Sequence, residues 1–446
     1  MQLVPGIEDS FVGSDGELQI GGVPVSKLAE EFGTPLFAYD ESLMRRKWSL
    51  LRSTFPPRFE IYYSVKANPN LSILAFFLAQ GAGLEIASAG ELCQAREAGC
   101  APDRLLFAGP GKTPAELQLA LTEGIGEVHA ESMLELERIA AIAANLHRRA
   151  PVAIRVNPEA DAQGGAMRMG GKPAPFGIDE ELLDTALDFA LSQSSIEFRG
   201  IHLFTGTQIL DSAVLVSQYR KGLQIAQRVA ARLGGPLHSL DFGGGLGVPY
   251  FPNERPLDMA MLCASLLDLE REIAADPRVA GTRLVIEPGR YLIAEAGVYL
   301  TRVLDVKASR GKKFVILDGG MNHHLAASGN LGQTIKRNFP IAVATKWDIP
   351  DEETVEVVGP LCTPLDTLGR AVAMPHVEVG DLLVVFQSGA YARAASPLGF
   401  LSYPSPPEVM AHNGRARLIR KRGEASDYLR DIEFVCEPLV SHQADD

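Results

Sequence analysis

Side chains that can do chemistry follow several short apolar runs of this chain, and the first is a lysine. Lys66 follows Ile61-Tyr62-Tyr63-Ser64-Val65 and stands just before Asn68-Pro69-Asn70. Proline lacks an N–H and restricts the residue before it, so the run ends at this turn. Most lysines are solvated surface residues, whereas a lysine at the last position of a buried strand is a candidate amine nucleophile for Schiff-base chemistry. The position of Lys66 alone leaves both interpretations open.

The segment around Lys66 predicts the element that would hold it. From about residue 39 to 300, short β-rich runs alternate with stretches of helical periodicity such as 131–147 and 180–191. Alternating βα units predict a parallel sheet, and eight of them over about 250 residues predict an α/β fold of the (β/α)8 TIM-barrel type. The alternative, an open doubly wound sheet, lacks its dinucleotide-binding fingerprint here. The predicted strands are 61–66, 84–87, 105–108, 127–130, 152–156, 200–204, 240–242 and 284–287.

The two ends of the chain have a different texture. After about residue 303, β-rich runs follow one another without regular helices, at 303–307, 313–317, 355–358, 382–386 and 416–420. This pattern predicts an antiparallel β domain, which residues 1–38 share in texture and are expected to join. The predicted domains are therefore an N-terminal segment at 1–38, a barrel at 39–303 and a C-terminal β domain at 304–446.

Composition excludes several classes of protein. The net charge of −13 argues against nucleic acid or an anionic membrane as the main partner. No apolar run approaches the roughly 18 residues of a membrane span, and no signal-peptide pattern opens the sequence. The five cysteines are scattered without Cys-x-x-Cys spacing, which fits neither a zinc site nor a disulfide framework. We expect a cytoplasmic enzyme.

A barrel carries its chemistry at the C-terminal ends of its strands. Gly243-Gly244-Gly245 follows one predicted strand; it is either a tight turn or a cradle of backbone N–H groups for a phosphate. Glu287 ends an apolar strand and needs a cationic partner, either Arg290 or the protonated ring nitrogen of a pyridine cofactor. Together with Lys66 and with Phe204 as a stacking face, these residues describe a site for pyridoxal phosphate (PLP).

The chain resembles the fold-type III PLP decarboxylases, the group of the diaminopimelate, ornithine and arginine decarboxylases. The resemblance extends from about residue 30 to 415 and is carried by 63–68, 243–245, 287–291, 359–362 and 389–391. It implies PLP as cofactor, Lys66 as its Schiff-base lysine and Glu287 as the partner of its ring nitrogen. It also implies a homodimer with two shared active sites, in which Cys362 of one subunit is the general acid at the other. The residues implied around the phosphate are Thr207, Gly243, Gly244, Gly245, Gly289, Arg290 and Tyr391.

The departures from the family pattern lie around the substrate. Phe204 replaces the usual ring-stacking histidine, Glu85 replaces an aspartate, and His202 is expected on the opposite strand face in a structural role. Thr363 stands where the amine decarboxylases carry an acidic residue, and no arginine follows Gly320-Met321-Asn322. A buried ammonium or carboxylate without its partner is expensive, so free diaminopimelate, ornithine and lysine are disfavoured.

The segments 321–340, 359–366 and 389–400 resemble a branch that includes exosortase-associated decarboxylases and the butirosin-pathway decarboxylase of a carrier-bound glutamyl group. That resemblance implies a substrate tethered to an acyl carrier protein, or an amino acid without a free distal charge. Thr363, Asp366 and Arg393 are the predicted substrate-binding residues, although Arg393 could instead form an interface salt bridge. The alternatives are a diaminopimelate decarboxylase, a PLP racemase and a catalytically inactive PLP-binding regulator.

His323 and His324 are adjacent and lack an accompanying carboxylate cluster. Neighbouring residues of one strand point to opposite faces, so we predict no metal site.

Overall fold

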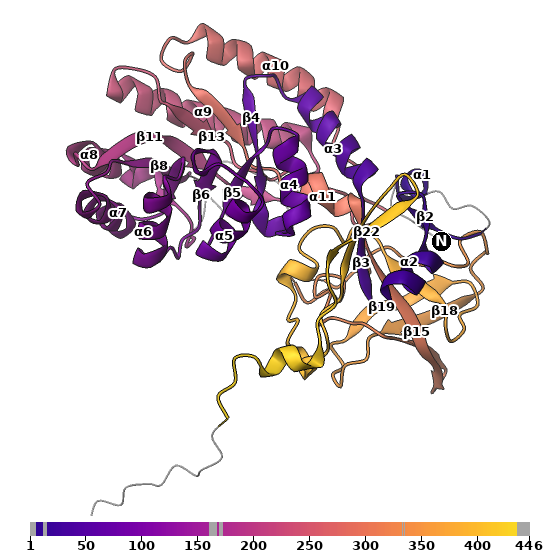
Figure 1. Cartoon of the computed structure of the whole chain (residues 1–446). Helices are drawn as coiled ribbons and strands as arrows, with labels where there is room; N and C mark the ends of the chain where they lie inside the picture. Colours follow the sequence, from indigo (N-terminus) through magenta and orange to yellow (C-terminus); the bar gives the residue numbers. More distant parts are fainter. Residues whose placement is uncertain are drawn as a thin grey trace, which may run out of the picture.

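The computed structural model describes residues 6–11, 16–159, 167–168, 173–331, 333 and 335–434. Figure 1 shows a helix-wrapped barrel at the upper left and a β domain at the lower right. Cys436, one of the scattered cysteines, lies outside the described residues.

Within the described residues, eight parallel strands close into a barrel, because β7 pairs with β8 as well as with β6. The pairing order around the barrel is β4-β5-β6-β7-β8-β11-β13-β14, and β14 returns to β4. The predicted (β/α)8 barrel is therefore confirmed. The barrel strands are β4 (Phe59–Ser64), β5 (Gly83–Ile86), β6 (Leu105–Phe107), β7 (Glu127–Ala130), β8 (Ala150–Asn157), β11 (Ile196–Leu203), β13 (Ser239–Asp241) and β14 (Arg283–Ile286).

The barrel strands are buried on both faces, because helices cover the outside and side chains fill the inside. Inside the barrel, Tyr62, Leu106 and Val285 form a small apolar cluster of their own. Buried polar side chains share the interior with this cluster, among them Glu127, His129, His202, Asp241 and Glu287. The surrounding helices are α3 (Glu41–Thr54), α4 (Leu71–Ala79), α5 (Ala89–Glu97), α6 (Pro114–Glu123), α7 (Met133–Asn145), α8 (Leu183–Ser192), α9 (Ser212–Leu233), α10 (Met259–Ala275) and the short α11 (Arg290–Ile293).

Local sequence sets where these helices begin. Asp40 caps α3 by accepting hydrogen bonds from the backbone of Ser42 and Leu43. Thr113 and Glu116 form a reciprocal capping box at the start of α6, with a proline at the first position. Such caps satisfy the free N–H groups of a helix start and so fix the point where each loop at the barrel rim ends.

The β domain contains every strand predicted for it and several more. Its sheet runs β19-β18-β16-β15-β3-β21-β22, and β20 pairs with both β15 and β17. Most pairings are antiparallel, as predicted, whereas β21 runs parallel to β3 and β16 runs parallel to β18. The strands are β3 (Leu36–Asp40), β15 (Gly297–Ser309), β16 (Lys312–Leu317), β17 (Ile341–Val343), β18 (Glu353–Val358), β19 (Thr367–Met374), β20 (Leu382–Val385), β21 (Glu408–His412) and β22 (Arg415–Arg420).

The N-terminal segment is part of this domain. Its strand β3, drawn in indigo among orange and yellow strands in Figure 1, lies between β15 and β21. The short helices α1 (Ile7–Ser10) and α2 (Val25–Phe32) and the hairpin of β1 (Gln19–Ile20) and β2 (Val23–Pro24) precede it. The domain boundaries at residues 38 and 303 stay predictions; β3 and β15 run across them. In the described part of the chain, no helix combines the length and apolar character needed to cross a bilayer.

Candidate active site

Lys66 lies directly after β4, in the single turn of 3-10 helix Val65–Ala67, rather than at the last strand position as predicted. Its amine Nζ is 2.9 Å from both carboxylate oxygens of Glu85 at the end of β5. Ser64 donates a further hydrogen bond to the same carboxylate, which is buried. Desolvation opposes the charged amine, but Glu85, Tyr391 and Glu287 together outweigh it and raise the pKa of Lys66 above its ordinary value.

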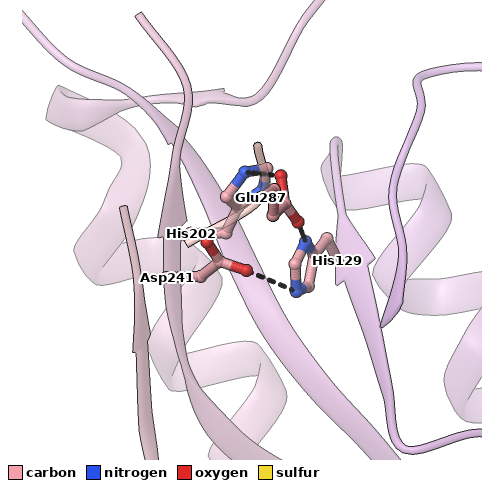
Figure 2. Close-up of side chains that lie close together, drawn as sticks. All are labelled: His129, His202, Asp241 and Glu287. Atoms are coloured by element: carbon pink, nitrogen blue, oxygen red, sulfur yellow. Dashed lines mark ion pairs between the residues drawn. The ribbon is translucent and has the colours of Figure 1, made fainter. Parts of the chain in front are cut away.

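Glu287 lies at the end of β14 and points into the barrel, where three other buried polar side chains meet it (Figure 2). His202 Nε2 is 3.3 Å and His129 Nδ1 is 3.8 Å from its carboxylate oxygens. The predicted outward orientation of His202 was wrong, because residues two apart on a strand share a face and His202 shares the inner face with Phe204. Burial would raise the pKa of Glu287, but the two histidines and Lys66 outweigh it and hold that pKa below its usual range.

The glycine triplet after β13 makes close backbone contacts that a side chain would prevent. Gly243 has a φ of +68°, and a Cβ there would lie 2.5 Å from the carbonyl oxygen of Leu203. A Cβ on Gly244 would lie 2.5 Å from the carbonyl oxygen of Glu287. The triplet therefore packs directly between the ends of β11 and β14, and only glycine fits.

A second close approach joins the loop after β14 to the lysine turn. A Cβ on Gly289 would lie 2.9 Å from Cβ of Ala67. The backbone N–H of Tyr391 donates to the carbonyl oxygen of Ala67 at 2.9 Å, with Tyr391 at a φ of +54°. Two distant segments are thus fastened to the turn that carries Lys66.

Arg290 is a cation held by aromatic rings. Its guanidinium donates to the hydroxyl of Tyr250 at 2.9 Å and lies 4.6 Å from the ring centroid of Tyr391. Its Nε is buried without a hydrogen-bond partner, which leaves a charged donor for an anion. No salt bridge between Arg290 and a rim carboxylate, one of the two predicted roles, occurs among the described residues.

Phe204 and Thr207 flank the triplet on the other side. A Cβ on Gly243 would lie 2.9 Å from the ring of Phe204. Thr207 belongs to the short strand β12 (Gly206–Thr207), and the backbone N–H of Ile209 just beyond it donates to the carbonyl oxygen of Gly245 at 2.9 Å. The predicted cofactor residues of the barrel rim therefore gather around the end of the barrel that carries Lys66.

Arg155 was missed by sequence reasoning. It lies on β8, pairs with Glu131 at 2.7 Å, and holds its guanidinium 5.8 Å from the ring centroid of Phe204. The available signal was a charged residue inside the otherwise apolar run 152–156.

The predicted substrate residues lie in the β domain, in the loop between β18 and β19 and after Tyr391. Cys362 is exposed, and within the described part of the chain its thiol forms no hydrogen bond to a barrel residue. Asp366 is 2% exposed and accepts backbone N–H groups from Met321 at 2.6 Å and Leu361 at 2.8 Å. Each of its oxygens thus accepts a hydrogen bond from within the domain, which makes Asp366 a support of the Cys362 loop, and its contact with the substrate stays a prediction. Arg393 lies in the turn Arg393–Ala395. Burial lowers the pKa of its guanidinium, and the negative charge of Glu408 opposes this shift.

His323 and His324 have structural partners, although they lie in a turn and not on a strand as predicted. His323 Nδ1 is 3.0 Å from the hydroxyl of Tyr299, and His324 Nε2 is 2.9 Å from Oγ of Ser388. Both rings are buried.

Comparison with known proteins agrees with this geometry. The family model described as "Pyridoxal-dependent decarboxylase, pyridoxal binding domain" matches residues 41–294. The chain is 41% identical to an L-glutamyl-[BtrI acyl-carrier protein] decarboxylase of Niallia circulans, over 90% of this chain and 94% of that one. It is 34% identical to a diaminopimelate decarboxylase of Aquifex aeolicus, over 93% and 95% of the two chains. The solved diaminopimelate decarboxylase of M. jannaschii in complex with L-lysine superposes with a TM-score of 0.87 at 27% identity, covering 96% of this chain and 98% of that one.

An eight-stranded barrel with an amine, a buried carboxylate and an aromatic-held cation at one rim defines a PLP-binding barrel enzyme. The chain belongs to the pyridoxal-dependent decarboxylases; it is a carboxy-lyase with PLP as cofactor. The residues present fit that cofactor, because Glu287 Oε1 and Arg290 Nε are both buried without a hydrogen-bond partner at the rim that carries Lys66.

Proposed function

We propose that this enzyme removes the α-carboxylate of a glutamyl-type group tethered to an acyl carrier protein. The observation that carries the proposal is the replacement of two charged side chains on the expected substrate side: Thr363 stands where the resemblance places an acid, and Ala326 where it places an arginine. The 41% identity to a decarboxylase of a carrier-bound glutamyl group supports the same substrate class. A thioester-linked acyl group has no distal charge, so neither replacement leaves a buried charge of such a substrate without a partner.

In this proposal, the barrel rim holds the cofactor. Lys66 would bind it covalently, Glu287 would face its ring nitrogen, and Phe204 would cover its ring. The phosphate would lie among Arg290, Tyr391 and the backbone of four glycines and a threonine, namely Gly243, Gly244, Gly245, Gly289 and Thr207. Bound PLP supplies the electron sink for the carbanion that CO2 leaves behind. Glu85 would hold and release the proton of Lys66 through their 2.9 Å contact.

We further propose a homodimer in which Cys362 of each subunit protonates the substrate carbon at the partner's Lys66. Cys362 is exposed in its own subunit, and exposed apolar side chains lie on neighbouring loops. A surface of this kind favours a protein contact. The apolar residues are Leu331, Leu365, Phe400 and Leu401, which are 40–51% exposed.

A cavity of about 630 Å³ supports the tethered form of the substrate. It lies between the barrel loop that contains Phe251 and strand β19 of the β domain, and Thr367 of its lining follows the Cys362 loop. Its wall also contains Lys336, Arg337 and Arg370. These cations could meet the phosphate of a pantetheine arm. The remaining wall combines apolar side chains with the polar Asn253, Ser328, Asn338, Asp351 and Thr367.

The decisive experiment measures CO2 release from matched substrates. Glutamate, meso-diaminopimelate, a glutamyl thioester of pantetheine and glutamyl-loaded carrier protein are compared by kcat/KM. The proposal expects the two thioesters to be preferred and carrier-loaded glutamyl to be preferred most. Preferred turnover of meso-diaminopimelate would overturn the proposal. It would indicate that this enzyme is a diaminopimelate decarboxylase, like the relative to which it is 34% identical. A protein that binds PLP but releases no CO2 from any of the four would support the inactive-regulator alternative, and loss of optical activity without CO2 would indicate a racemase.

The shared-site proposal has a separate test. Lys66→Ala and Cys362→Ala proteins are each expected to be inactive. If sites are shared, unfolding and refolding the two together restores part of the activity, because some mixed dimers contain one intact site. Failure to restore activity, with mixed dimers confirmed by mass, would contradict a shared site.

A further inference from the structure

The loop after β13 contains a tyrosine that contacts Arg290, the cation proposed to meet the phosphate of the cofactor. Tyr250 is 6% exposed, and its hydroxyl accepts a hydrogen bond from Nη1 of Arg290 at 2.9 Å. The ring of Tyr391 lies against the same guanidinium, with 4.6 Å between the ring centroid and the central carbon. One ring therefore engages a particular donor of Arg290, and a second ring limits the space in which the guanidinium can move.

The hydrogen bond to Tyr250 decides which edge of the guanidinium is left for a ligand. A guanidinium is a planar fork of N–H donors without an acceptor. Nη1 donates to Tyr250, whereas Nε is buried and has no hydrogen-bond partner among the described residues. The edge of Arg290 that carries Nε and Nη2 is therefore left to donate two parallel hydrogen bonds to one phosphate group.

The barrel holds the backbone on both sides of Tyr250. Gln208, directly after β12, pairs with Val248 through both ends of its amide: its nitrogen donates to the carbonyl oxygen, and its oxygen accepts the backbone N–H at 3.2 Å. The backbone N–H of Tyr250 itself donates to the carboxylate of Glu254 at 2.8 Å. A loop fastened in this way presents its side chain in a fixed direction.

The β domain contacts the same tyrosine from another side. Gln387, two residues after β20, is 2% exposed, and its amide nitrogen donates to the carbonyl oxygen of Pro249 at 3.1 Å. The ring of Phe339, in the segment before β17, lies 4.9 Å from the ring of Tyr250, centroid to centroid. Tyr250 is thus held jointly by the barrel and by the β domain.

Resting on the phosphate role proposed for Arg290, we propose that Tyr250 is a positioning residue: it turns the Nε edge of Arg290 toward the phosphate of the cofactor, and the β domain holds it in place. Without the hydroxyl, Arg290 keeps its charge but loses the contact that fixes the orientation of its guanidinium. The phosphate end of the cofactor site is then completed across the boundary between the two domains.

The first test compares PLP with pyridoxal, which has the same ring and aldehyde but no phosphate. Both affinities are measured on the full-length apo protein by absorbance titration. Tyr250→Phe keeps the ring and removes the hydroxyl, so we expect about 3- to 10-fold weaker binding of PLP and unchanged binding of pyridoxal. Equal weakening for both ligands would indicate a general structural effect and overturn the positioning role, as would an unchanged affinity for PLP.

Tyr219→Phe is the matched control. Tyr219 lies in α9 and is 1% exposed, and its hydroxyl has no hydrogen-bond partner within the described part of the chain. Its ring lies 4.9 Å from the ring of Phe242, so this substitution also removes a buried hydroxyl from an aromatic contact. Both affinities should stay unchanged. A selective loss of PLP affinity as large as that of Tyr250→Phe would overturn the proposal.

Arg290→Gln separates the positioning role from the proposed function. If Arg290 binds the phosphate, this variant loses affinity for PLP and not for pyridoxal. Adding Tyr250→Phe to it should then cause little further loss, because both residues act through one contact. A fully additive loss in the double variant would overturn the positioning role alone. Equal affinities of Arg290→Gln and wild type for PLP would overturn that role together with the phosphate site around Arg290.

Phe339→Leu tests the part played by the β domain, and it carries the test if Tyr250→Phe does not fold. It removes the ring contact with Tyr250 and leaves the hydroxyl in place. We expect about 2- to 5-fold weaker binding of PLP, unchanged binding of pyridoxal, and a phosphorus NMR signal of bound PLP that shifts in the same direction as in Tyr250→Phe. A Phe339→Leu protein with the affinity and phosphorus signal of wild type would overturn the support assigned to the β domain.

Discussion

The contact between Lys66 and Glu85 makes a specific and unusual prediction: Glu85→Gln should accelerate covalent capture of PLP. Capture requires the neutral amine, and Glu85 holds the pKa of Lys66 above its ordinary value. At 2.9 Å the pair is worth about 1.4 kcal/mol at the dielectric of water and about 6 kcal/mol at an effective dielectric of about 20. Since the lysine side chain is 43% exposed, solvent screening favours the lower figure.

About 1.4 kcal/mol corresponds to one pKa unit and hence to a tenfold larger fraction of neutral amine at pH 7–8. Stopped-flow absorbance of the apo protein at saturating PLP measures the capture rate apart from the encounter step. The ratio of the capture rates of Glu85→Gln and wild type should fall toward one as the pH rises through the raised pKa of Lys66, because the amine is then neutral in both proteins. The charged pair also stabilises the fold at neutral pH and loses this contribution as the pH rises from the ordinary pKa of lysine through the raised pKa of Lys66, so the variant should be less stable by up to about 1 kcal/mol at pH 7.

The matched control is Glu180→Gln, which removes a buried carboxylate paired with Lys221 on the outside of the barrel. It should leave the capture rate unchanged. Equal or slower capture by Glu85→Gln at every pH, with PLP saturating, would refute the idea that Glu85 restrains the amine. Glutamine still accepts the hydrogen bond from Ser64, so loss of that contact would not explain such a result.

Other substitutions test neighbouring parts of the site. Arg290→Gln should weaken PLP binding by about 10- to 100-fold in absorbance titrations, since a charge-assisted contact is worth about 1.5–3 kcal/mol; Arg337→Gln, an exposed guanidinium above Phe251, should not. Asp366→Asn leaves one of two buried N–H groups without an acceptor and should cost about 1–3 kcal/mol in urea denaturation, whereas an unchanged midpoint would contradict the support role. Burial and the charge of Glu85 raise the pKa of Glu91 to about 7. Wild type should therefore lose stability between about pH 5 and pH 7 relative to Glu91→Gln, by no more than about 3 kcal/mol, and parallel pH profiles in thermal denaturation would contradict that shift.

The barrel could be predicted from the sequence because each of its strands is a local signal. A strand buried on both faces is a short apolar run, and the helices between such runs have their own period. The rim residues Lys66 and Glu287 could be found for the same reason, since each directly follows such a run. Strands β17, β19 and β21 were missed because they are short, or carry glycine and charged residues, and are stabilised mainly by pairing with distant strands.

The inner cluster could not be predicted, because closure of the barrel creates it. His129, His202 and Asp241 lie on different strands, far apart in the sequence, and each looks like an ordinary polar interruption of a strand. The pairing of β7 with β8, and of β11 with β13, brings these side chains into one space. The supporting role of Asp366 was missed for a related reason: only the folded loop reveals that the backbone of Met321 and Leu361 donates to its two oxygens.

The two ends of the proposed cofactor site are prepared by opposite electrostatic means. At Lys66 a carboxylate stabilises the protonated amine, so the lysine can react with PLP only after it has lost that proton. At Glu287 buried histidines stabilise the carboxylate, so this end is ready before any ligand binds. The effect at Glu287 depends on burial, whereas solvent screens the pair of Glu85 with the half-exposed Lys66. It follows that changes at Glu85 should alter how fast PLP is captured, whereas changes around Glu287 should alter how tightly it is held.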